Sequence, residues 1–147
     1  MTDNDRAFCT ATASLLRASG TIAAWGLALS GISMTVLALT GRSLSLTSCM
    51  GFGAVVIVGV LERYLALRIR LDIGLFDALA QGTLPSLASL DGALHRLGVL
   101  EVSQAPATPR ALDARVVGAR HLMRRHGIAV VCQSALFLLA LLTQDLQ

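Results

Sequence analysis

The stretch from Leu44 to Ala80, LSLTSCMGFGAVVIVGVL followed by ERYLALRIRLDIGLFDALA, decides the fold of this 147-residue chain. Its first half is an apolar run that is long enough, as a helix, to cross a bilayer. Glu62 and Arg63 begin the second half, in which charged residues are interspersed with leucine and isoleucine. No helix breaker separates the two halves at this point. The stretch therefore predicts a membrane-spanning helix that continues into polar surroundings.

The segment after Leu61 has two possible periodicities. Leucine and isoleucine at every second position from 65 to 75 are typical of a strand. A helix would instead present a thinner apolar stripe, formed by Leu65, Ile69, Phe76 and Leu79. A lone strand beside a bilayer has no partner for its backbone groups. We therefore predict a helix that ends near Gln81 and Gly82.

The composition of the chain indicates an integral membrane protein. Hydrophobic residues make up 54% of the sequence and charged residues only 14%, a balance that is wrong for an ordinary soluble domain. We predict an all-α fold: an integral membrane helical bundle of about three transmembrane helices with a cytoplasmic helical segment. The expected parts are a lead-in at 1–20, a transmembrane hairpin at 21–61, the cytoplasmic segment at 62–126, and a third transmembrane helix with a short tail at 127–147.

The third span depends on what precedes it. The apolar run from Ile128 to Thr143 covers only about 24 Å as a helix, which is short for a bilayer. The preceding segment opens with Thr108 and Pro109, a cap followed by a proline suited to the first helical turn. If that helix continues through Gly127, the run becomes the end of a longer span. A re-entrant or interfacial helix is the alternative.

The arginines predict the orientation of the chain. All twelve cationic residues are arginine. With three spans, eleven of them share one face with the N-terminus and the 62–127 segment, and only Arg42 lies on the other face. Because cytoplasmic loops carry an excess of arginine and lysine, we expect a cytoplasmic N-terminus, an external C-terminus and location in a bacterial-type inner membrane.

Small residues predict how the first two spans pack. Ala23, Gly26, Ser30 and Ser33 recur on one face of the first span. Gly51, Val55 and Gly59 form a groove on the second. Small side chains let helix backbones approach closely in lipid, where apolar surface gives no drive to associate. We expect the two faces to meet.

Candidate site residues cluster at the inner ends of the spans. The charge of Glu62 costs free energy at this position unless it is paired or hydrated. Glu62 could form a salt bridge with Arg63 or with a neighbouring helix. Alternatively, it could belong to a site for a ligand, a proton or a partner. Gln133 should seek a backbone carbonyl, Ser30 or Ser33 as its hydrogen-bond partner. The residues expected to bind a partner or lipid are Glu62, Arg63, Arg68, Arg70, Asp72, Asp77, Arg120, Arg124 and Arg125.

The sequence lacks the motifs of several functional classes. Neither a phosphate loop nor a hydrolase or metalloprotease signature is present. His121 and His126 do not share a helix face, so we expect no metal site, and no cofactor is indicated. The basic cluster from Arg120 to His126 has no aromatic residues between its cations, in contrast to the basic surfaces of nucleic-acid-binding proteins.

Three hypotheses for function remain. The first is a structural or accessory subunit that docks a protein partner or another copy and contacts membrane lipids. The second is a small oligomeric transporter or channel, with Ser30, Ser33 and Gln133 near the path. The third is an enzyme acting on lipid headgroups.

Overall fold

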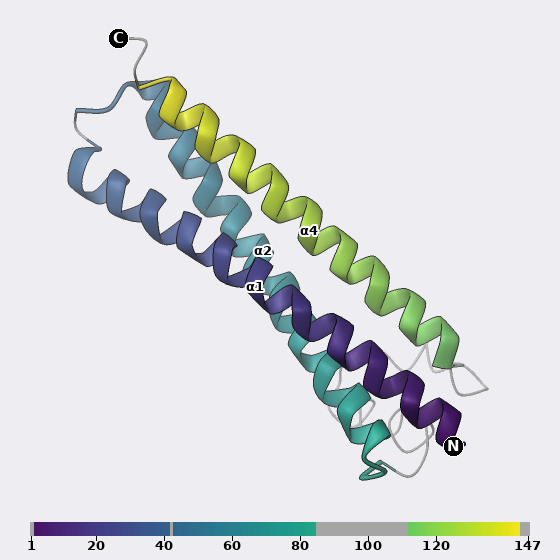
Figure 1. Cartoon of the computed structure of the whole chain (residues 1–147). Helices are drawn as coiled ribbons and strands as arrows, with labels where there is room; N and C mark the ends of the chain where they lie inside the picture. The colour runs from purple at the N-terminus through teal and green to yellow at the C-terminus, as the bar shows by residue number, and fades with distance from the viewer. Residues whose placement is uncertain (1, 42, 85–111, 145–147) are drawn as a thin grey trace, which may run out of the picture. The chain divides into compact units, whose positions relative to one another are not determined.

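The chain folds into long helices, as the sequence predicts. The computed structural model describes residues 2–41, 43–84 and 112–144, and these form α1 (Asp3–Thr40), α2 (Leu46–Ala80) and α4 (Leu112–Leu142) (Figure 1). Each of the three is long and apolar enough to cross a membrane. The predicted all-α class with three candidate spans is confirmed.

The helices contribute to two compact units. One consists of Met1–Arg17 and Arg70–His121, and the other of Ala18–Ile69 and Leu122–Gln147. Each unit therefore draws on all three helices. The second unit holds most of the apolar spans, and we call it the span unit.

Helix α1 begins earlier than expected and absorbs the lead-in. The Thr2 backbone N–H donates to Asp5 Oδ2 at 2.8 Å, and the Asp5 N–H donates to Thr2 Oγ1 at 3.3 Å. This reciprocal pair is a capping box with Asp in the place of the usual Glu or Gln, and it fixes the first turn. The helix then continues through Gly20, because one exposed glycine costs only about 1 kcal/mol within a long helix. The N-terminal segment and the first span are one element.

Helix α2 confirms the choice of helix over strand for residues 62–80. It runs unbroken from Leu46 to Ala80, and the predicted stripe is buried at Ile69, Phe76 and Leu79. Gly82 ends it in the left-handed region with φ of 73°, where glycine has no steric penalty. Residues 85–111 of the predicted cytoplasmic segment lie outside the described residues.

Helix α4 passes through Gly127 without interruption and ends at Leu142. The short apolar run is thus the end of a 31-residue helix, long enough for about 46 Å. Continuity of the helix, the condition for a third span, is confirmed.

Packing in the span unit partly follows the expected small faces. A Cβ on Gly59 would overlap with Ser30 Oγ, so α1 and α2 approach closely there. Gly51 instead faces α4, where an added Cβ would lie 2.8 Å from the Cβ of Ala140. The expectation that Gly51 opposes the first span was wrong, because the groove on α2 serves two neighbours.

Candidate functional site

The most unusual group in the span unit is the carboxylate of Glu62, whose side chain is 0% exposed. Buried positions on α2 recur at 48, 52, 55, 59, 62, 66 and 69. This alternation of three and four residues is the seam of a left-handed helical bundle. Glu62 occupies a seam position that an apolar residue would normally fill. Its position on the helix therefore places the Glu62 side chain in the interior of the span unit.

The guanidinium of Arg63 neutralises and holds this carboxylate. Arg63 donates from Nε to Glu62 Oε2 at 2.7 Å and from a terminal nitrogen to Oε1 at 2.9 Å. The same guanidinium also donates to the backbone carbonyl of Ala23 on α1. The predicted Glu62–Arg63 salt bridge is present, and it links α2 to α1 as well.

His126 connects the third helix, α4, to this carboxylate. Its Nε2 lies 2.7 Å from Glu62 Oε1, and its side chain is fully buried. Its Nδ1 has no hydrogen-bond partner in the described part of the chain. The short contact between Nε2 and Oε1 links α4 to the carboxylate on α2.

Gln133 forms a second polar layer one heptad after His126. Its Nε2 donates to Gly26 O at 3.0 Å and Ser30 Oγ at 2.8 Å, with Val55 O at 3.4 Å. The expected pairing with a backbone carbonyl or Ser30 is confirmed. Ser33, the other candidate partner, is buried, and its Oγ has no partner in the described residues.

These residues form what we call the buried polar cluster: Glu62, Arg63, His126, Gln133 and Ser30. Gly26 and Gly59 make room for it. A Cβ on Gly26 would lie 3.0 Å from Glu62 Cδ and 3.1 Å from Gln133 Oε1. Larger residues at these two positions would separate the helices that the cluster joins.

The cluster lies near the predicted cytoplasmic end of the spans. Glu62 follows the start of α2 by sixteen residues, and His126 precedes the end of α4 by the same number. Both distances correspond to about 24 Å, against a hydrocarbon thickness of about 30 Å. At this depth an unpaired charge is costly, and the pairing within the cluster removes that cost.

The remaining candidate residues are not part of this cluster. Arg68, Arg70, Arg120, Arg124 and Arg125 are exposed. Asp77 forms an ion pair with Arg17 of α1, and Asp72 is half-buried and engaged in an interaction.

His126 is the residue of the buried polar cluster that sequence reasoning missed. Its neighbours Arg124 and Arg125 suggested a surface basic cluster. The available signal was its spacing, since it precedes Gln133 by seven residues and so shares the buried seam of α4.

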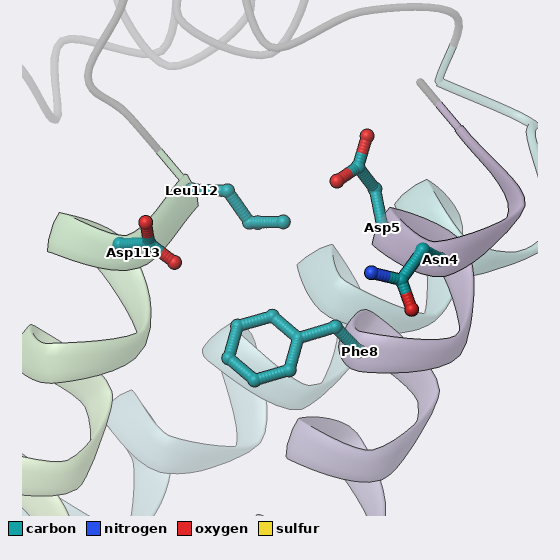
Figure 2. Close-up of a pocket in the computed structure, with 5 residues that line it drawn as sticks. All are labelled: Asn4, Asp5, Phe8, Leu112 and Asp113. Atoms are coloured by element: carbon teal, nitrogen blue, oxygen red, sulfur yellow. The ribbon is translucent and has the colours of Figure 1, made fainter.

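A cavity of about 450 Å³ occurs in the other unit, which consists of Met1–Arg17 and Arg70–His121. It is lined by Asn4, Asp5 and Phe8 of α1 and by Leu112 and Asp113 of α4 (Figure 2). Figure 2 shows Phe8 and Leu112 extending into the space between the two helices. The Asp5 carboxylate already belongs to the α1 cap. Among the described residues, no group of three or more His, Cys, Asp or Glu side chains could hold a metal ion.

No protein-family model, curated protein or solved structure matches this chain.

Proposed function

We propose that this chain is a multi-pass protein of a bacterial-type inner membrane that acts as a structural or accessory subunit. It binds a protein partner or a second copy through the exposed charged residues of its cytoplasmic helices. The observation that carries this proposal is that the Glu62 carboxylate is fully paired within the chain. Glu62 has hydrogen bonds to both carboxylate oxygens and no exposed surface, so its chemistry is used within the chain.

The arginine distribution supports the proposed orientation. Eleven of the twelve arginines fall on the side of the N-terminus and the 62–127 segment. This asymmetry favours a cytoplasmic location for that side, with the C-terminus outside. The exposed charged residues then face the cytoplasm, where a soluble or membrane-bound partner can reach them.

The transporter hypothesis has less support. A path through the spans needs polar groups that face a cavity. Ser30 and Gln133 instead bond to each other and to the carbonyl of Gly26. Ser30 and Gln133, two of the three residues proposed to line a path, thus connect helices, which is the usual role of polar side chains in membrane bundles.

The lipid-enzyme hypothesis also has less support. General acid–base catalysis requires a carboxylate within hydrogen-bonding reach of a substrate. Both oxygens of Glu62 are occupied by Arg63 and His126. An accessory role uses the same residues without requiring the cluster to open.

Partner docking is assigned to exposed charges in the unit that consists of Met1–Arg17 and Arg70–His121. Arg70 and Arg120 are exposed there. Asp77, half-buried, already pairs with Arg17. Exposed charges contribute little to stability but select partners by charge complementarity. Arg70 is therefore the residue whose charge can be reversed without unfolding the chain.

The test is purification of the tagged full-length chain from its native membrane in a mild detergent. We expect the wild type to elute with a stoichiometric partner or as a defined oligomer, identified by mass spectrometry and by molar mass from light scattering. Arg70→Glu should lose that association and keep its thermal unfolding midpoint. Arg6→Glu, an exposed charge reversal near the N-terminus, is the control and should retain it. A monomeric wild type, or an Arg70→Glu variant that keeps its partner, would overturn the proposal.

A further inference from the structure

Three arginines among the described residues of the span unit form no ion pair within it. The sequence between 18–69 and 122–144 contains a single acidic residue, Glu62, and Arg63 and His126 already hold it. Arg68, Arg124 and Arg125 are exposed and form no ion pair with any residue that the structure describes. Their charge is therefore available to an external anion.

The register of α2 and α4 brings these arginines to a similar depth. Ser48 Oγ lies 3.2 Å from Thr143 Oγ1, and Glu62 Oε1 lies 2.7 Å from His126 Nε2, so the two helices are antiparallel neighbours. Continuing this register by one to two turns past Glu62 brings Arg68 to within about one turn of Arg124. Arg124 and Arg125 lie only one or two residues from His126. The three guanidinium groups therefore belong to neighbouring turns of two adjacent helices.

This depth is that of lipid headgroups. Arg124 and Arg125 precede the end of α4 by eighteen and seventeen residues, or about 27 and 26 Å. Arg68 follows the start of α2 by twenty-two residues, or about 33 Å. These values bracket the hydrocarbon thickness of about 30 Å. Tyr64, 57% exposed on α2, precedes Arg68 by one turn, and tyrosine is enriched at this boundary.

We propose that Arg68, Arg124 and Arg125 form a binding site for the phosphate headgroup of an anionic phospholipid in the cytoplasmic leaflet. Guanidinium groups suit this ligand because their planar N–H fork matches two phosphate oxygens. The long arginine side chain can also reach the headgroup while its methylene groups stay in the apolar region. The inference rests on the proposed membrane location and orientation and is independent of any protein partner.

The single tryptophan of the chain provides a local probe. Trp25 is 57% exposed, and its Nε1 donates to Ser134 Oγ on α4 at 3.2 Å. Ser134 follows Arg124 and Arg125 by ten and nine residues, or about 15 and 14 Å along the helix. One leaflet contributes about half of the 30 Å hydrocarbon thickness. A lipid whose headgroup is held at the three arginines therefore places its acyl chains at the depth of Trp25.

The experiment is fluorescence quenching of Trp25 by acyl-brominated phospholipids, with the full chain reconstituted in vesicles. Brominated phosphatidylglycerol is compared with brominated phosphatidylcholine to give a relative binding constant. Each guanidinium beside an anionic headgroup should contribute about a fivefold preference at low salt. The wild type should prefer phosphatidylglycerol, and this preference should decrease as salt is added.

Variants identify the site. Arg124→Gln should lower the preference about fivefold, and the combined change of all three arginines to Gln should abolish it. Arg6→Gln removes a cation outside the site and should retain the wild-type preference. Circular dichroism of each sample checks that helix content is unchanged. If the triple variant does not fold, Arg68→Gln and Arg124→Gln alone decide the question.

Two results would overturn the inference in different ways. Equal quenching of the wild type by both lipids, or an undiminished preference in Arg68→Gln and Arg124→Gln, refutes the lipid site and leaves the proposed membrane subunit intact. Absence of quenching by either brominated lipid would show that the chain is not inserted, and both proposals would fail together.

Discussion

Replacement of Gly59 by alanine tests the close approach of α1 and α2 directly. The added Cβ would overlap with Ser30 Oγ and lie 3.0 Å from Gln133 Nε2. The serine would have to rotate away and give up its bond to Gln133, or the helices would have to separate. Overpacking of this kind costs about 1–3 kcal/mol. Alanine in place of glycine returns about 0.5–1 kcal/mol through the helix backbone, so we expect a net loss of about 1–2 kcal/mol.

Gly53→Ala is the matched control on the same helix. A Cβ at Gly53 meets nothing within 4 Å, so only the backbone effect applies, and stability should stay level or rise by up to about 1 kcal/mol. The assay is equilibrium unfolding of the full chain in mixed micelles of mild detergent and sodium dodecyl sulfate, followed by circular dichroism. The difference between the two variants should be about 2 kcal/mol.

Ser30→Ala completes a double-mutant cycle with Gly59→Ala. Alone, it removes one acceptor of Gln133 and should cost about 0.6–1.7 kcal/mol. Combined with Gly59→Ala, it removes the overlapping oxygen, so the double variant should be more stable than the sum of the two losses by about 1 kcal/mol. Equal stabilities of Gly59→Ala and Gly53→Ala, or strict additivity in the cycle, would refute the predicted contact between Gly59 and Ser30.

Three further predictions follow from the ion pairs and the topology. Glu62→Ala leaves the neighbouring guanidinium and imidazole without their shared carboxylate and should cost about 3–5 kcal/mol in the same unfolding assay; a loss below 1 kcal/mol would contradict the buried pairing. Arg17→Glu breaks only the partly exposed pair with Asp77 and should change stability by less than about 1 kcal/mol, so a larger loss would contradict the weak role assigned to it. A cysteine added after Gln147 should react with a membrane-impermeant maleimide in intact cells, and one replacing Ser103 should not; labelling at Ser103 would reverse the orientation.

The helices were predictable where one physical constraint dominated. Hydrophobic length and the absence of a breaker at Glu62 predicted the continuous α2, and the backbone argument outweighed the strand-like alternation of residues 65–75. Gln133 also followed from a general constraint, since a buried amide in lipid must find acceptors. The prediction named a carbonyl and Ser30 correctly, but it could not choose the carbonyls of Gly26 and Val55 as the acceptors without the register between helices.

The partners of each helix face were less predictable. A groove of small residues on α2 indicates that some helix approaches closely, but Gly51 meets Ala140 of α4 while Gly59 meets Ser30 of α1. His126 shows a related difficulty. Its basic neighbours point outward, and only the seven-residue spacing to Gln133 indicates that this histidine points inward. Such spacing predicts that a residue is buried. It does not predict which carboxylate the residue contacts, because that contact depends on tertiary packing.

The adjacency of Glu62 and Arg63 has a consequence for biosynthesis. The two charges are neighbours in the chain, and their ion pair needs no other helix to form. Residue 126 is synthesised 64 positions after residue 62, a delay of about 3–13 s at ordinary translation rates. During that interval the α1–α2 hairpin already contains the counter-ion of its acid. The contact between Glu62 and the imidazole of His126 can form only after α4 has been synthesised.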